Sequence, residues 1–145
     1  MRGLMAVCGR SAGVMLADPP SGYDFVGFDA GLAAAQASGK PVFLYFGRYG
    51  CAWCEHTNRK TFSDPELKKR YSAHYVLVYV DAEPGRRVTL PSGERITGTE
   101  LGTRLNTFAT PLFVCVTPQG EKIMQVPGFK TVLDFRDYDR YVRGG

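Results

Sequence analysis

The segment Val42-Phe43-Leu44-Tyr45-Phe46-Gly47-Arg48-Tyr49-Gly50-Cys51-Ala52-Trp53-Cys54 decides the fold. Residues 42–46 form a short apolar and aromatic run, which is typical of a buried strand. Residues 47–50 then break the strand, with a glycine at each end. Cys51 begins the next segment, and residues 54–60 can continue as a helix. Two cysteines separated by two residues therefore stand where a buried strand ends and a helix begins.

This placement of the two cysteines has a chemical use. The free N–H groups and the macrodipole of a helix N-terminus favour negative charge. The thiolate is the reactive form of cysteine, so Cys51 is placed where its nucleophilic form is stabilised. A two-residue spacer lets Cys54 reach Cys51 and close a disulfide. Because thiol–disulfide exchange needs one sulfur to attack and a second to resolve the mixed disulfide, the pair predicts redox chemistry.

Two other interpretations of the pair stay open. Cys51, Cys54 and His56 could supply three zinc ligands, although a structural zinc site wants four, usually from a second paired cluster that this sequence lacks. The two cysteines could also be inert. A c-type haem would need histidine directly after the second cysteine, where this chain has Glu55. We predict no bound metal and no cofactor besides the redox-active disulfide itself.

The rest of the chain alternates between helical and strand patterns. Asp18-Pro19-Pro20-Ser21-Gly22 is a linker, and a hairpin is expected about Pro91-Ser92-Gly93. Helices are expected over residues 29–38, 54–60, 97–106 and 131–141, and from a start at 63–66 to about residue 73. Further strands are expected over 75–80, 112–116 and 122–126. This order predicts an α/β fold with a central mixed sheet flanked by helices on both faces.

The chain has 145 residues and a formal charge of +4, and its length and composition indicate one globular domain. We expect residues 1–22 to be a tail or a degenerate signal segment with a linker, and residues 23–145 to be the domain. The apolar start favours export to the periplasm over a cytoplasmic location. The basic residues are spread along the chain, which argues against nucleic-acid binding. Cys115 lies in an apolar strand and is expected to be a buried, inert thiol.

The order strand, Cys-x-x-Cys, helix, and later Thr110-Pro111 opening another strand resembles the thioredoxin superfamily over about residues 39–142. The resemblance implies a thioredoxin fold in which Pro111 is cis and faces the active disulfide. It also implies that the backbone of Thr110 pairs with a strand of a protein disulfide substrate. A thioredoxin-like binding module that needs no turnover is the alternative function.

A finer resemblance is to the bacterial thioredoxin-related proteins of the SoxW type, which are exported reductases associated with sulfur oxidation. The residues that carry it are Asp81, the insert around Gly93, Thr99-Glu100-Leu101, Thr110-Pro111, Gly120, Pro127-Gly128-Phe129 and the segment 135–142. This resemblance implies a reductase with a membrane electron donor of the DsbD or CcdA type. We expect a monomer.

The chain departs from ordinary thioredoxin around the cysteines. Gly50 stands where thioredoxins have tryptophan, and the spacer is Ala52-Trp53 instead of Gly-Pro. Tyr45 replaces the buried acid that is thought to relay a proton to the second cysteine. Glu55 or His56 could accept that proton instead, and the alternative is that both are solvent-facing helix residues.

Trp53 is the only tryptophan of the chain, and its position between the two cysteines makes it a candidate substrate contact. The alternative is a capping residue packed over Tyr49 or Phe46. Arg48 and Tyr49 in the preceding loop are also possible contacts, or simply loop residues.

Overall fold

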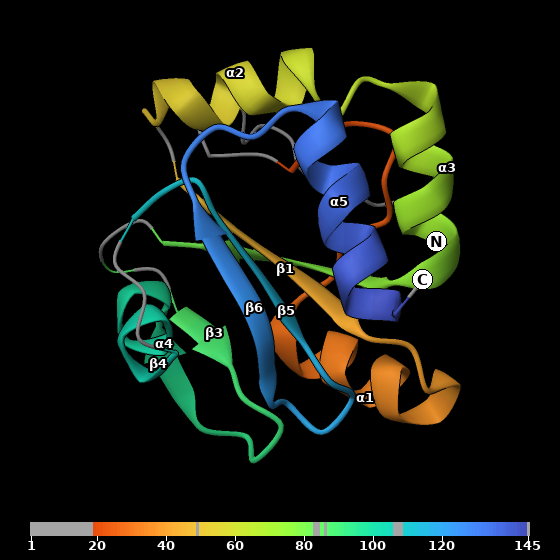
Figure 1. Cartoon of the computed structure of the whole chain (residues 1–145). Helices are drawn as coiled ribbons and strands as arrows, with labels where there is room; N and C mark the ends of the chain where they lie inside the picture. Colours follow the sequence, from red (N-terminus) through yellow and green to blue (C-terminus); the bar gives the residue numbers. More distant parts are fainter. Residues whose placement is uncertain (1–18, 49, 83–84, 86, 106–108, 145) are drawn as a thin grey trace.

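The computed structural model describes residues 19–48, 50–82, 85, 87–105 and 109–144. It has a central sheet with helices on both faces (Figure 1). The helices are α1 (Phe28–Ser38), α2 (Ala52–Lys60), α3 (Pro65–His74), α4 (Gly98–Arg104) and α5 (Val132–Arg143). The strands are β1 (Val42–Gly47), β2 (Val76–Asp81), β3 (Arg87–Thr89), β4 (Arg95–Thr97), β5 (Leu112–Val116) and β6 (Lys122–Pro127).

The main sheet has four strands in the order β2-β1-β5-β6. Strand β1 runs parallel to β2 and antiparallel to β5, and β5 is antiparallel to β6. The expected mixed sheet is therefore confirmed. Strands β3 and β4 form the expected hairpin as a separate two-stranded sheet. Within the described residues, no helix is both long enough and apolar enough to span a bilayer.

Strand β1 lies between two cores, which explains its uninterrupted apolar sequence. All six of its residues are buried. Successive side chains of a strand point to opposite faces of the sheet. Val42, Leu44 and Phe46 accordingly pack in the core that contains residues of α1 and α4. Phe43 and Tyr45 pack in the opposite, largely aromatic core with residues of α3 and α5.

Local signals in the sequence place the helix ends. Gly39 ends α1 in the left-handed conformation, with a φ of 77°, that glycine adopts most readily. The Asp64 carboxylate accepts the Leu67 N–H at the start of α3, with proline in the first turn. Thr131 and Asp134 form a capping box at the start of α5.

The helix expected over residues 97–106 is shorter than predicted. Thr97 is its N-cap, and α4 ends at Arg104, while residue 106 lies outside the described residues. Residues 1–18 also lie outside them, so the predicted tail or signal segment has no structural description. Tyr23 is buried against the aromatic core, and Val26 makes an isolated parallel bridge to Val78.

Candidate redox site

Cys51 and Cys54 are joined by a disulfide, with their Cα atoms 5.2 Å apart. Cys51 is the N-cap residue of α2, and its sulfur accepts the backbone N–H of Cys54 at 3.0 Å. The sequence places it there because β1 ends at Gly47, three residues before the turn at Gly50. Both cysteines are buried, with Cys51 8% and Cys54 5% exposed. The sulfur of Cys51 thus lies against a helix N-terminus, where negative charge is stabilised.

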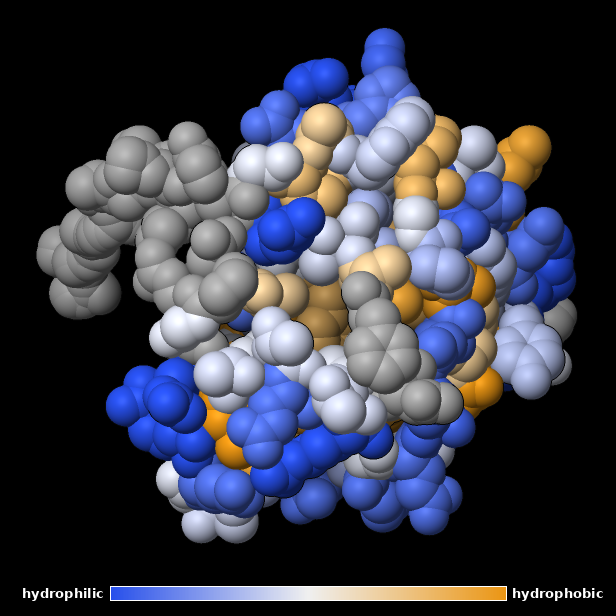
Figure 2. Space-filling view, turned by 90° about the vertical axis from the view of Figure 1, so that its left-hand side faces the viewer, coloured by the Kyte–Doolittle hydropathy of each residue, from blue (hydrophilic) through white to orange (hydrophobic). Residues whose placement is uncertain are grey.

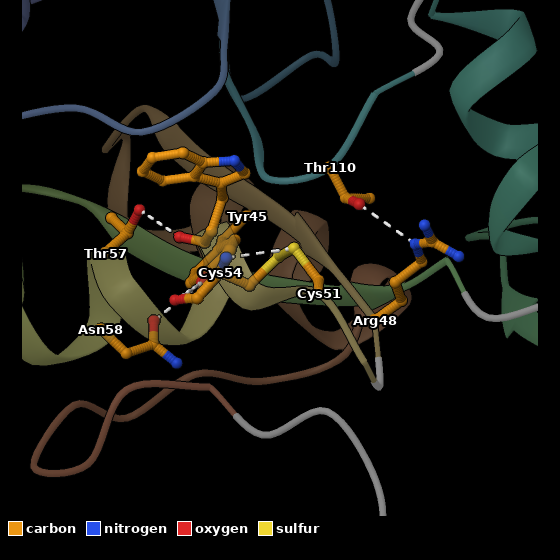
Figure 3. The surroundings of a disulfide bond; sticks show 8 residues. Tyr45, Arg48, Cys51, Cys54, Thr57, Asn58 and Thr110 are labelled. Atoms are coloured by element: carbon orange, nitrogen blue, oxygen red, sulfur yellow. Dashed lines mark hydrogen bonds between the residues drawn. A yellow bond between two sulfur atoms is a disulfide. The ribbon is translucent and has the colours of Figure 1, made fainter.

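A hydrogen-bonded network lies on the Cys54 side of the disulfide (Figure 3). The Tyr45 hydroxyl donates to Asn58 Oδ1 at 2.7 Å and lies 3.3 Å from the carbonyl oxygen of Cys54. The buried Thr57 hydroxyl donates to the Trp53 carbonyl at 2.7 Å. Burial raises the pKa of Tyr45, so the phenol stays neutral over the physiological range. A neutral hydrogen-bonding group therefore occupies the position where thioredoxins have an ionisable acid.

The Thr110–Pro111 segment lies on the other side of the site. Its peptide bond is cis, as the superfamily resemblance implied. Arg48 Nε donates to Thr110 Oγ1 at 3.2 Å, and Gly128 N–H donates to the Pro111 carbonyl at 2.8 Å. Three segments that are far apart in the sequence, around residues 48–58, 110–111 and 128–130, are therefore tied together at the site.

Trp53 is 60% exposed, and its ring contacts are with His56 and Phe129. The ring centroids of Trp53 lie 5.5 Å from His56 and 6.1 Å from Phe129, and those of His56 and Phe129 are 4.7 Å apart. We call these three side chains the aromatic cluster. Phe46 is instead buried in the core on the α1 side, and Tyr49 lies outside the described residues. Trp53 is thus partly exposed and packs against His56 and Phe129.

The side chains of the two candidates for the proton relay, Glu55 and His56, have other partners than Cys54. Glu55 forms an ion pair with Arg59 at 3.6 Å, one helical turn away. His56 lies against Phe129. The backbone N–H of Glu55 donates to the Cys51 carbonyl at 3.1 Å, but among the described residues no hydrogen bond joins the side chain of Glu55 or His56 to either cysteine. The solvent-facing alternative describes Glu55 well, and the relay stays a prediction for both residues.

Comparison with known proteins identifies the family. The chain matches the family described as a thioredoxin-like domain over residues 28–143. It belongs to that family. This thioredoxin-like protein is 27% identical to a thioredoxin from Thermus thermophilus, with a TM-score of 0.68 over 83% of this chain and 87% of that one. No curated protein matched it.

Two further solved structures share the fold of this thioredoxin-like protein. A DsbH oxidoreductase is 16% identical, with a TM-score of 0.68 over 97% of this chain and 95% of its own. The reduced DsbD C-terminal domain of Neisseria meningitidis is 19% identical, with a TM-score of 0.59 over 80% of this chain and 91% of its own.

Cys115 of the thioredoxin-like protein is a buried free thiol, as predicted. Burial, and then the negative charge of Asp139, raises its pKa to about 12. Such a thiol carries almost no thiolate near neutral pH. Within the described part of the chain, no three histidine, cysteine or acidic side chains are grouped so that they could hold a metal ion.

Sequence reasoning missed two residues of the site in this thioredoxin-like protein, Asn58 and Phe129. Asn58 follows Cys54 by four residues on α2, and residues at this spacing share a helix face. That spacing could have placed Asn58 near the buried Tyr45. No local signal marks Phe129 as a neighbour of Trp53, because the two residues belong to segments that only the tertiary fold brings together.

Proposed function

We propose that this chain is a thiol–disulfide oxidoreductase that reduces protein disulfides. The observation that carries the proposal is the Cys51 sulfur at the N-terminus of α2, accepting the Cys54 N–H at 3.0 Å. This arrangement favours the thiolate at Cys51 when the disulfide is reduced. The Cys54 sulfur, bonded to it in the oxidised state, is the resolving group.

The reaction proceeds in two exchanges. The Cys51 thiolate attacks one sulfur of the substrate disulfide, forming a mixed disulfide and releasing one substrate thiolate, which takes up a proton. The Cys54 thiolate then attacks Cys51 Sγ and releases the second substrate thiol. The substrate gains two electrons and two protons, and the protein is left with the Cys51–Cys54 disulfide. A dithiol donor must reduce it again.

The substrate chain binds beside Thr110 and Trp53 in this proposal. In the described part of the chain, no hydrogen bond uses the backbone N–H or C=O of Thr110, so both are available to an added strand. Thr110 lies two residues before the start of β5 at Leu112. The exposed ring of Trp53 offers an apolar contact nearby.

The reducing direction, the periplasmic location and a membrane electron donor of the DsbD or CcdA type rest on the SoxW-type resemblance. Equilibration with glutathione or dithiothreitol tests the direction. A reduction potential near that of thioredoxin, about −270 mV, supports a reductase. A value near about −120 mV would instead indicate an oxidant that introduces disulfides.

A binding module without turnover is the second candidate. The exposed Trp53 ring of the aromatic cluster favours it, because such rings act as anchors at interfaces. The variant Cys54→Ser separates the two functions. A catalyst accumulates mixed disulfides through Cys51 in this variant, whereas a passive binder holds its partner without a covalent bond.

A further inference from the structure

Arg48 is held in a fixed position at the edge of the redox site. Its carbonyl oxygen accepts the N–H of Cys51 at 3.3 Å, and its Nε donates to Thr110 Oγ1 at 3.2 Å. The first bond connects the Arg48 backbone to the nucleophile, and the second connects the Arg48 side chain to the proposed strand-pairing residue. In Figure 3, Arg48 and Thr110 lie together on the Cys51 side of the disulfide, away from Tyr45 and Asn58.

The terminal nitrogens of Arg48 remain available. The side chain is exposed, and in the described part of the chain neither Nη atom takes part in an ion pair or hydrogen bond. Several other arginines contrast with it, because each has a carboxylate partner: Arg59, Arg70, Arg104, Arg140 and Arg143. As far as the described residues extend, Arg48 therefore presents a positioned guanidinium edge without a carboxylate partner.

The surface around the site has two different chemical characters. The aromatic cluster of Trp53, His56 and Phe129 borders it along α2 and the segment after β6. Arg48 borders it next to Thr110. Figure 2 shows the side of the molecule on which α4 and the β3–β4 hairpin lie, with pale and orange residues in the middle and strongly hydrophilic residues above and below.

We propose that this thioredoxin-like protein prefers substrate disulfides that have an acidic side chain close to the attacked cysteine, and that Arg48 binds this carboxylate. The inference rests on the proposed function and adds the substrate class. A substrate chain that pairs with the Thr110 backbone passes next to the Arg48 guanidinium, since that group is hydrogen-bonded to the Thr110 side chain. The free edge of a guanidinium matches the two oxygens of a carboxylate. Arg48 is thus a specificity-determining residue.

The expected preference is modest because the contact lies at an exposed edge. A single well-placed surface ion pair corresponds to about a threefold to fivefold change in an equilibrium or rate ratio. The preference should also weaken as salt screens the two charges. The modest size and the salt dependence of the preference distinguish an ion pair from a gain in rate that comes only from packing.

The test uses the whole reduced chain and short peptides closed by a disulfide. Glutamate and glutamine are compared at each of the two positions on either side of the attacked cysteine. The second-order rate constant for oxidation of the reduced chain is measured with each peptide. At one or more of these positions, we expect the glutamate peptide to react about three to five times faster than its glutamine counterpart at low salt. In about 1 M NaCl this ratio should fall toward one.

Variants of Arg48 show whether this residue reads the charge. In Arg48→Gln the ratio of the glutamate rate to the glutamine rate should fall to about one. Because both peptides are measured with the same variant, a general loss of activity does not change this ratio. Arg48→Lys should keep part of the preference, since the charge remains and the planar fork is lost. Arg136→Gln is the matched control, because Arg136 is an exposed arginine of α5 and the same charge is removed.

The outcomes separate this inference from the function on which it rests. Equal rates for glutamate and glutamine at every position in the unmodified protein would overturn the specificity while leaving a disulfide reductase. A preference that persists in Arg48→Gln would also overturn it. Failure to reduce any of the peptides, together with no reversible Cys51–Cys54 couple, would overturn the proposed function and this inference with it.

Discussion

The hydroxyl of Tyr45 lies 2.7 Å from Oδ1 of Asn58, and it joins the central strand β1 to the helix that carries the disulfide. The same hydroxyl lies 3.3 Å from the Cys54 carbonyl oxygen. The Tyr45–Asn58 hydrogen bond therefore connects the sheet to the first turns of α2. It fixes the backbone of the resolving cysteine with a group that carries no charge at neutral pH.

Removing this hydroxyl should loosen α2. In Tyr45→Phe the Asn58 side chain loses its partner in Tyr45, and we expect the free energy of unfolding to fall by roughly 1–2 kcal/mol. Urea unfolding followed by circular dichroism measures the change. Tyr141→Phe is the control, because Tyr141 is 68% exposed, and it should unfold like the unmodified protein. An equal loss in both variants would contradict the role of the Tyr45–Asn58 bond.

The three cysteines of the described chain should differ in reactivity once the disulfide is reduced. Cys51 is expected to react with iodoacetamide at a pH below the ordinary thiol value of about 8.5, because α2 stabilises its thiolate. Cys115, whose pKa burial raises to about 12, should stay unmodified in the folded protein. Mass mapping after a pH series of alkylation measures both. Modification of Cys115 before Cys51 would show that the helix N-terminus does not activate the site.

Acid should weaken the packing of the C-terminal helix α5 against α3 and Tyr75. Burial acts to raise the pKa of Asp139, but hydrogen bonds from Arg143, Tyr75 and Arg70 outweigh it and hold the pKa at about 2, below the ordinary 3.8. The lowered pKa contributes about 2 kcal/mol of stability that is fully present above pH 4 and is lost as the pH falls toward 2.

Comparison of the unmodified protein with Asp139→Asn tests this dependence. The difference in unfolding free energy should be largest at neutral pH and should shrink between pH 4 and 2. Asp137→Asn serves as the control, because Asp137 pairs with Arg140 on the exposed surface and should show a small difference at every pH. A difference that is constant with pH would mean that the Asp139 charge is not what stabilises the helix.

Trp53 should matter more for protein substrates than for small ones. Because the Trp53 ring is exposed, Trp53→Ala should remove contact area for a substrate and leave the core packing unchanged. We expect kcat/KM for a protein disulfide to fall about tenfold, which corresponds to a moderate interface residue. Reduction of a small aromatic disulfide reagent should change less. Leu133→Ala, at an exposed apolar residue of α5, is the matched control and should change neither rate.

Much of the fold follows from local sequence, and the reasons are physical. The apolar run of β1 predicts a strand buried on both faces, and Gly39 and Asp64-Pro65 mark helix ends through their own backbone preferences. The Cys51–Cys54 disulfide can be predicted from the spacing of the two cysteines, because both lie within one helical turn. The helix expected over 97–106 ends earlier, at Arg104, and no glycine or proline directly after Arg104 marks this end in the sequence.

The surroundings of the disulfide could not be predicted in the same way. Arg48 and Thr110 are separated by 62 residues, and only the pairing of β1 with β5 brings their loops together. Phe129 reaches Trp53 because β6 pairs with β5 and ends beside Pro111. Contacts of this kind depend on the sheet order, which no local pattern specifies.

The position of β1 between two strands also affects how this protein binds its partners. Strand β1 has a neighbour on each side along its length, and Cys51 follows its last residue by four positions. Backbone amides in such a strand exchange with deuterium only through large-scale unfolding. We expect β1, which leads to the nucleophile, to be among the slowest-exchanging of the described residues, and the recognition surface to be formed before a partner binds. Partners would then dock by rigid-body fit, with oxidised and reduced forms of this protein nearly superimposable.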